Sequence, residues 1–196
     1  MKKVRIGIFG GTFDPLHNGH LYLAKMAKEE GNLDSVMFLP LNVPPHKPQP
    51  IASGSQRLEM INKAIKNYPD FFSSDIELNR SGTTYTVDTV NELLLIHPEY
   101  DIHYIIGQDS LLCLDTWKNA KELFTKCSFI CLLRPNCDDY KDKLNKLQNM
   151  GAKIQVIEKM GLDVSSTKVK SSLDFINNVP CEILTDVINI YKGEQK

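Results

Sequence analysis

The stretch IFGGTFDPLHNGHLYLAKMAK, residues 8–28, decides the fold. It starts inside the apolar, β-branched run VRIGIFG (4–10), which predicts a buried strand. Two glycines follow, and a helix is expected through about Glu30, capped by Asn18 or a residue beside it. A buried strand that passes through a glycine turn into an amphipathic helix is typical of α/β proteins with parallel sheets.

The same alternation of strand and helix continues along the chain. Further strands are expected at 35–40, 71–78, 101–107, 128–135 and 152–158. Helices are expected at 53–69, 86–98, 109–127 with a break near Asp115, 138–150, 166–178 and 181–193. The proline-rich segment 41–50 is expected to be an ordered loop. This pattern predicts one α/β domain over residues 1–196, a doubly wound parallel sheet with a C-terminal helical segment at about 164–193.

Composition narrows the class of protein. Of the 196 residues, 42% are hydrophobic and 24% are charged, close to the average of a globular protein. The formal net charge of −1 leaves no global basic field that would attract nucleic acid or a membrane surface. Five cysteines without a CxxC pair indicate free thiols in a reducing compartment, and no segment has the roughly 20 apolar residues of a membrane span. We therefore expect a cytoplasmic protein, and a homo-oligomer is compatible with the sequence.

Two histidines, His17 and His20, stand at the join between the glycine turn and the first helix. Their spacing lets both face one side of the first helical turn. Three interpretations stay open: a helix cap with a packing residue, metal ligands without a clearly placed third ligand, or phosphate ligands that stabilise charge during phosphoryl or nucleotidyl transfer. Gly10 and Gly11 allow the backbone to approach a ligand closely.

A second helix start follows the last expected strand. Its hydroxyl residues are Ser165, Ser166 and Thr167. Hydroxyls and free N–H groups at a helix start suit either an ordinary cap or an anion, and Lys168 and Lys170 add local charge. Two such helix starts beside one parallel sheet predict a site that a polyphosphate bridges.

At this point the chain resembles a known superfamily. GGTFDPLHNGH (10–20) and SSTKVK (165–170) are similar to the signatures GxFxPxHxGH and SSTxxR of the HxGH nucleotidyltransferases. The segments VPPHK (43–47), TYTVDTV (84–90), IGQDSLLCLDTWKN (106–119) and LLRP (132–135) resemble the bacterial nicotinate-mononucleotide adenylyltransferases. The resemblance runs from Ile6 to Lys170 and implies a Rossmann-like nucleotidyltransferase fold.

Members of that family join ATP to nicotinate mononucleotide, giving deamido-NAD and pyrophosphate without a covalent enzyme intermediate. The resemblance implies that His17, His20 and Lys47 contact the reacting phosphates, with His20 at the α-phosphate. It also implies Mg²⁺ that bridges the ATP phosphates with few or no dedicated protein ligands. The implied ATP site comprises Gly10, Gly11, Thr12, Phe13, His17, His20, Ser165, Ser166, Thr167 and Lys170.

The implied nicotinate nucleotide site comprises Thr84, Tyr85, Thr86, Asp109, Trp117 and Arg134. Read as residues alone, Trp117 suits stacking on a pyridinium ring or core packing. Asp109 could bind a ribose hydroxyl or serve as a helix N-cap. Arg134 could bind the nucleotide phosphate or lie on the solvated surface. The family's second signature usually ends in Arg, whereas Lys170 keeps the charge here and loses the bidentate fork.

Several rival functions share part of this pattern. Pantetheine-phosphate adenylyltransferases carry both signatures but do not need the PPHK, TYTVDT and DTWKN segments. Cytidylyltransferases usually carry an RTxGIST second signature. A nucleotide-binding protein without catalysis, or a metal-binding protein that uses His17 and His20, represents a different class. Preference for the acid form of the substrate is implied by the resemblance alone, and backbone N–H groups around Thr84–Thr86 are one hypothesis for its basis.

Overall fold

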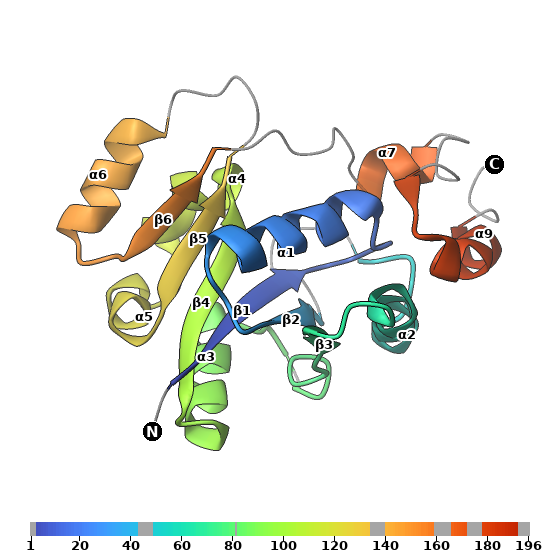
Figure 1. The fold of residues 1–196 in the computed structure, drawn as a ribbon, viewed down its shortest axis with the longest axis horizontal. Coiled ribbons are helices and arrows are strands. Elements are labelled where there is room, and N and C mark those ends of the chain that lie inside the picture. Colours follow the sequence, from blue (N-terminus) through green and yellow to red (C-terminus); the bar gives the residue numbers. More distant parts are fainter. Residues whose placement is uncertain are drawn as a thin grey trace.

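A sheet of six parallel strands forms the centre of the molecule. The computed structural model describes residues 3–42, 49–80, 82–133, 140–158, 166–171 and 178–191. The strands are β1 (Val4–Gly11), β2 (Ser35–Pro40), β3 (Phe71–Ser73), β4 (Tyr100–Gly107), β5 (Ser128–Leu132) and β6 (Ile154–Ile157). They lie in the order β3-β2-β1-β4-β5-β6 (Figure 1), so the expected doubly wound parallel sheet is confirmed.

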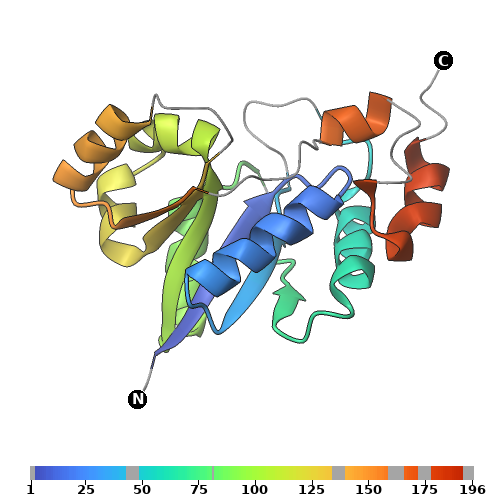
Figure 2. The same cartoon turned by 45° about the horizontal axis from the view of Figure 1, so that its top comes forward.

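Helices cover both faces of this sheet. They are α1 (Asn18–Glu30), α2 (Gly54–Ile65), α3 (Thr86–Ile96), α4 (Gln108–Cys113), α5 (Ala120–Lys126), α6 (Lys141–Asn149), α7 (Ser166–Ser171) and α9 (Leu184–Tyr191), with 3₁₀ turns η1 (Leu114–Thr116) and η2 (Cys181–Ile183). The apolar residues of α1, α2 and α9 form one core, and those of α3, α4, α5 and α6 form the other (Figures 1 and 2). None of the described helices is long and apolar enough to cross a membrane.

The strand residues alternate between the two cores, as the pleat of a strand requires. Ile8 belongs to the core under α3 and α5, whereas its neighbour Phe9 belongs to the core under α1 and α2. Both side chains are at most 8% exposed. A strand buried on both faces accounts for the continuous apolar run at the start of the sequence.

The direction of the chain through the sheet reverses beside β1. This strand pairs with β2 on one side and with β4 on the other, so Phe9 lies next to Phe38 and Ile105. In an open parallel sheet, the crevice between the carboxyl ends of such strands is where ligands bind. The fold therefore places the segments after Gly11 and Gly107 at one potential site.

The clearest differences between the expected and the observed elements concern two segments. The strand expected at 71–78 is wrong beyond Ser73, because the Asn79 backbone N–H bonds to the Asp75 carbonyl and closes a turn. The helix expected at 109–127 is divided, and the break expected near Asp115 is confirmed by η1. A new helix then begins after Asn119, whose φ of 51° lies in the left-handed region and cannot continue a helix.

Candidate active site

The turn after β1 sets the direction in which α1 starts. Phe13 has a φ of 50°, an unfavourable value for a residue with a bulky side chain. Its ring is 2% exposed and contacts Phe9, Phe38 and His20 at centroid distances of 5.6, 5.8 and 5.0 Å. This aromatic packing offsets the backbone strain and fixes the glycine turn against the sheet.

His17 and His20 cap α1 reciprocally. The His20 backbone N–H donates to His17 Nδ1 at 3.3 Å, and the His17 backbone N–H donates to His20 Nδ1 at 3.2 Å. The rings stack with centroids 3.6 Å apart. The capping interpretation is thus realised, with His17 rather than its neighbour Asn18 as the N-cap residue.

The cap also determines where each imidazole carries its proton. Burial lowers the pKa of His17 from 6.5 to about 4, so this ring is neutral at pH 7. A neutral ring whose Nδ1 accepts a hydrogen bond holds its hydrogen on Nε2. The cap therefore presents imidazole Nε2–H groups as donors, which suits the binding of phosphate oxygens. The described residues contain no cluster of three His, Cys, Asp or Glu side chains that would complete a metal site.

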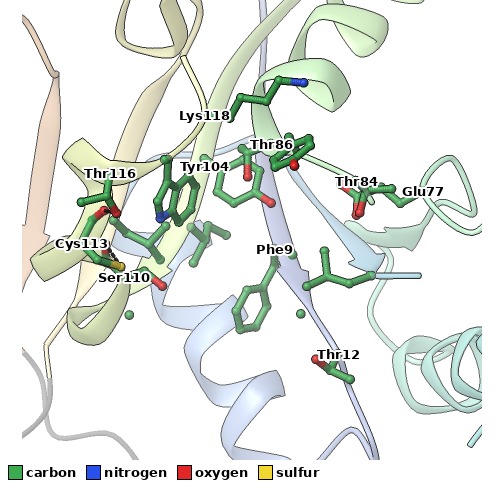
Figure 3. Close-up of a pocket in the computed structure, with 18 residues that line it drawn as sticks. Phe9, Thr12, Glu77, Thr84, Thr86, Tyr104, Ser110, Cys113, Thr116 and Lys118 are labelled. Atoms are coloured by element: carbon green, nitrogen blue, oxygen red, sulfur yellow. Dashed lines mark hydrogen bonds between the residues drawn. The ribbon is translucent and has the colours of Figure 1, made fainter. Parts of the chain in front are cut away.

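A cavity of about 540 Å³ opens where β1 and β4 end (Figure 3). Phe9, Gly10, Gly11 and Thr12 line it from the β1 side. Figure 3 places Thr84 and Glu77 opposite Ser110, Cys113 and Thr116. The complete lining is Phe9, Gly10, Gly11, Thr12, Leu41, Glu77, Thr84, Tyr85, Thr86, Tyr104, Ile105, Ile106, Gly107, Ser110, Cys113, Thr116, Trp117 and Lys118. Its volume falls in the range of pockets that bind small molecules. The structure thus brings Gly10–Thr12, Thr84–Thr86 and Trp117 to one cavity.

Trp117 lines the cavity from the segment between η1 and α5. Its ring meets Tyr104 edge-on, with centroids 6.0 Å apart and planes at 86°. Tyr104 is buried and its hydroxyl is hydrogen-bonded to the Thr86 side chain. A Cβ atom added to Gly10 would lie 2.4 Å from that hydroxyl, so only glycine fits beneath Tyr104. The core-packing interpretation of Trp117 is confirmed, and because the residue also lines the cavity, stacking on a pyridinium ring stays a prediction.

Glu77 is a cavity residue that the sequence analysis missed. Its side chain is 1% exposed and accepts hydrogen bonds from the hydroxyls of Thr84 at 3.1 Å and Thr89 at 2.7 Å. Burial raises the pKa of Glu77 above its ordinary value, and the two threonine hydrogen bonds oppose that rise. This carboxylate ties the segment 84–86 to the start of α3. In the sequence, Glu77 could have been noticed as an acidic residue within the otherwise strand-like run FFSSDIEL (71–78).

Other predicted residues lie apart from the cavity or outside the described residues. Asp109 is exposed in the first turn of α4 and does not line the cavity. Of the two interpretations of Asp109, the helix N-cap is wrong, because Gly107 holds the N-cap position. The residues that lie outside the described part of the chain are Lys47, Ser165 and Arg134.

The second predicted helix start docks onto the first motif. α7 begins at Ser166, whose hydroxyl donates to the Pro15 carbonyl at 3.1 Å, and Thr167 is exposed. Lys170 forms an ion pair with Asp14, its Nζ lying 3.1 Å from the carboxylate. Figures 1 and 2 both show α7 beside the start of α1. The structure therefore brings together the two signatures, which are about 150 residues apart in the sequence.

Arg57 of α2 fixes the ends of β1 and β2 beside the site. Its guanidinium is buried and donates to the carbonyls of Thr12 and Leu41 at 2.8 Å each. It also donates to the backbone carbonyls of Ala52 at 3.2 Å and Asn42 at 3.4 Å. Burial lowers the pKa of Arg57, and nearby Asp14 opposes this effect. A single cation thus satisfies four backbone carbonyls that converge next to the glycine turn.

Comparison with known proteins agrees with this geometry. Residues 8–172 match the family described as cytidylyltransferase-like. A probable nicotinate-nucleotide adenylyltransferase of Exiguobacterium sibiricum is 36% identical, covering 96% of this chain and 99% of its own length. A protein of the same description from Halalkalibacterium halodurans is 41% identical, covering 86% of this chain and 79% of its own.

A solved structure shares the fold. The nicotinic acid mononucleotide adenylyltransferase of Plasmodium falciparum, complexed with NaAD, superposes with a TM-score of 0.79 at 20% identity and covers 98% of this chain and all of its own. The relative from Exiguobacterium sibiricum matches almost end to end. This chain belongs to the nicotinate-nucleotide adenylyltransferase family.

Proposed function

We propose that this chain transfers the adenylyl group of ATP to nicotinate mononucleotide, giving deamido-NAD and pyrophosphate in NAD biosynthesis. The observation that carries the proposal is the cavity at the carboxyl ends of β1 and β4. It begins at the glycines of the first signature and ends at Trp117, and the Phe9 ring on its floor lies 6.0 Å from the ring of His20. A nucleotide in this cavity has its phosphate near the histidine cap.

The chemistry requires positioning and charge stabilisation rather than a protein nucleophile. An oxygen of the nicotinate nucleotide's phosphate attacks the α-phosphorus of ATP, and the bond from that phosphorus to the oxygen bridging to the β-phosphate breaks in line. Charge on the equatorial oxygens is stabilised by fixed donors. We assign this role to the Nε2–H of His20, with His17 at the neighbouring phosphates and Lys47 as the cation in the 41–50 loop.

The remaining ATP contacts follow from the two docked signatures. Gly10 to Phe13 allow the backbone close to the nucleotide, and Ser165, Ser166 and Thr167 hold the β- and γ-phosphates. ATP would bind together with Mg²⁺, which would supply further neutralisation of the phosphate charge. Mg²⁺ retains water and substrate ligands readily, so the proposal assigns no protein carboxylate to it.

The nicotinate nucleotide occupies the other end of the cavity. Trp117 stacks on the pyridinium ring, a contact that combines apolar burial with attraction of the cation to the π face. The segment Thr84–Thr86, fixed by Glu77, surrounds the ring from the other side. We retain Arg134 as a phosphate ligand and Asp109 as a ribose ligand. Because Asp109 is exposed and lies outside the cavity lining, that last assignment requires the substrate to extend beyond the cavity.

The proposal is tested with purified protein, ATP, Mg²⁺ and one of two acceptors. Pyrophosphate release with nicotinate mononucleotide, and none with phosphopantetheine, is the expected result. Release with phosphopantetheine alone would replace this function by that of the nearest rival. ATP binding without release in either case would indicate a nucleotide-binding protein without catalysis.

A matched pair of histidine variants then tests the catalytic assignment. Loss of one fixed donor to the transition state lowers kcat by roughly 10²–10³-fold, so His20→Ala should fall in that range. His97→Ala is the control, since His97 caps the far end of α3 and stacks on Tyr100. Equal activity of the two variants would contradict the role of His20. We also propose a cytoplasmic location, supported by the unpaired thiols of Cys113, Cys127, Cys131 and Cys181.

A further inference from the structure

Asp14 connects the first signature to three distant parts of the chain. Its carboxylate is 5% exposed and accepts the backbone N–H groups of Ile51 at 3.1 Å and Ala52 at 3.0 Å. Lys170 of α7 donates at 3.1 Å, and the Tyr191 hydroxyl of α9 donates at 2.6 Å. Two C-terminal helices therefore converge on one carboxylate that stands three residues before His17.

The position of this carboxylate creates an electrostatic conflict with the proposed reaction. ATP phosphates are anionic and are expected to bind at the start of α1 and at α7, next to Asp14. A buried negative charge at that place repels them through a region of low dielectric constant. The charge is compensated by Lys170 and by the nearby guanidinium of Arg57, and it is stabilised by the Tyr191 hydroxyl.

We propose that Lys170 and Tyr191 are positioning residues for ATP: acting through Asp14, they neutralise this carboxylate and hold α7 against the first signature. The inference rests on the proposed function. Lys170 stands where the family signature usually has Arg. According to the inference, its role is to compensate the charge of Asp14, which requires a cation long enough to reach that carboxylate. A direct triphosphate contact by Lys170 is the competing explanation, because an ammonium has three donors and can serve two acceptors.

Charge-removing variants of the pair separate these explanations. In Asp14→Asn, the Lys170 ammonium loses its carboxylate, and in Lys170→Met, the carboxylate loses its cation. When both changes are combined, neither charge is left uncompensated. Either single change breaks the contact between Asp14 and Lys170 that holds α7 against the first signature. We expect this loss of position to outweigh the removal of the repelling charge, so each single variant should raise KM for ATP about tenfold. The double variant should remain near tenfold, because contacting residues of one ion pair are strongly non-additive.

Several controls distinguish positioning from general damage. Lys170→Arg should keep KM for ATP within about twofold, because the guanidinium retains the charge and pairs with carboxylates. Lys63→Met removes a cation that holds α9 through Asp186 at 3.0 Å without touching Asp14, so KM for ATP should stay unchanged. KM for nicotinate mononucleotide should also be unchanged in all variants, since its cavity does not include Asp14.

Tyr191→Phe provides a variant that removes one oxygen and keeps the packing of the ring. It should raise KM for ATP about threefold at constant kcat, at the low end of the cost of losing one hydrogen bond, because Lys170 still compensates the Asp14 charge. If Lys170→Met does not fold, as shown by its melting curve, the Tyr191→Phe result decides alone, and an unchanged KM for ATP in that variant overturns the inference.

Two further outcomes would overturn the inference. A double variant whose KM for ATP rises about a hundredfold, the product of the single effects, would assign Lys170 to the triphosphate itself. If Lys63→Met raises KM for ATP as much as Lys170→Met does, the effect comes from the docking of α9 and not from Asp14. If the wild-type chain releases no pyrophosphate, the proposed function fails, and equilibrium dialysis of ATP against the same variants then tests the Asp14 inference separately.

Discussion

The capping histidine makes the stability of the fold dependent on pH in a defined interval. Burial lowers the pKa of His17 to about 4, compared with 6.5 for the unburied side chain. Between these values the unfolded chain binds more protons than the folded chain, so the free energy of unfolding falls as the pH falls. At roughly 1.4 kcal/mol per pH unit, the difference amounts to about 3 kcal/mol. The side chain is only 4% exposed, so solvent screening does not reduce this value substantially.

The assay is urea unfolding at several pH values from 7.5 to 4, with His17→Asn as the matched control. Asparagine is a good N-cap residue whose side-chain oxygen accepts the same backbone hydrogen bond, but it does not titrate. Between pH 7.5 and 4, the wild-type chain should lose about 3 kcal/mol more than the variant. Asp115, whose pKa is lowered to about 2 by Lys143 and Lys146, affects only a lower interval and is common to both proteins. Identical pH dependence of the two proteins would refute the neutral, buried cap.

Three further predictions concern the cavity and the backbone beside it. Gly10→Ala should lower the free energy of unfolding by about 1–3 kcal/mol. Adding Tyr104→Phe should recover part of this loss, because the atom 2.4 Å from the new Cβ is the tyrosine hydroxyl. Chemical denaturation measures both effects, and no recovery in the double variant would contradict the clash. Arg57→Met should lower the free energy of unfolding by about 3 kcal/mol or more, because buried carbonyls lose their hydrogen-bond donor. A smaller loss in the same assay would contradict the role of Arg57 in fixing the ends of β1 and β2. Trp117 is the only tryptophan, so nicotinate mononucleotide should quench intrinsic fluorescence, and an unchanged spectrum at saturation would exclude stacking.

The parts of this account that could be predicted from the sequence depend on local patterns. Neighbouring residues determine the strand from Val4, the helix from Asn18 and the helix after Ser53, and the structure has each of them. The carboxyl ends of parallel strands share one edge, so the convergence of Gly10 and Trp117 also follows from the expected topology.

The parts that could not be predicted depend on contacts between distant residues. Glu77 looks like one more strand residue until Thr84 and Thr89 are seen to donate hydrogen bonds to its carboxylate. Asp14 and Tyr191 are 177 residues apart, and no periodicity connects them. Strand and helix patterns record which face of an element is apolar, and they carry no information about which polar groups meet.

The central claim is that one cavity and the adjoining histidine cap hold both nucleotides with their phosphates between them. A crystal structure of this chain with deamido-NAD tests it most directly. We expect the nicotinate ring against Trp117 and within contact of Thr84–Thr86, with a phosphate oxygen within hydrogen-bond distance of His20 Nε2. A product bound with its nicotinate ring outside this cavity, or with its phosphates out of reach of both His17 and His20, would contradict the account.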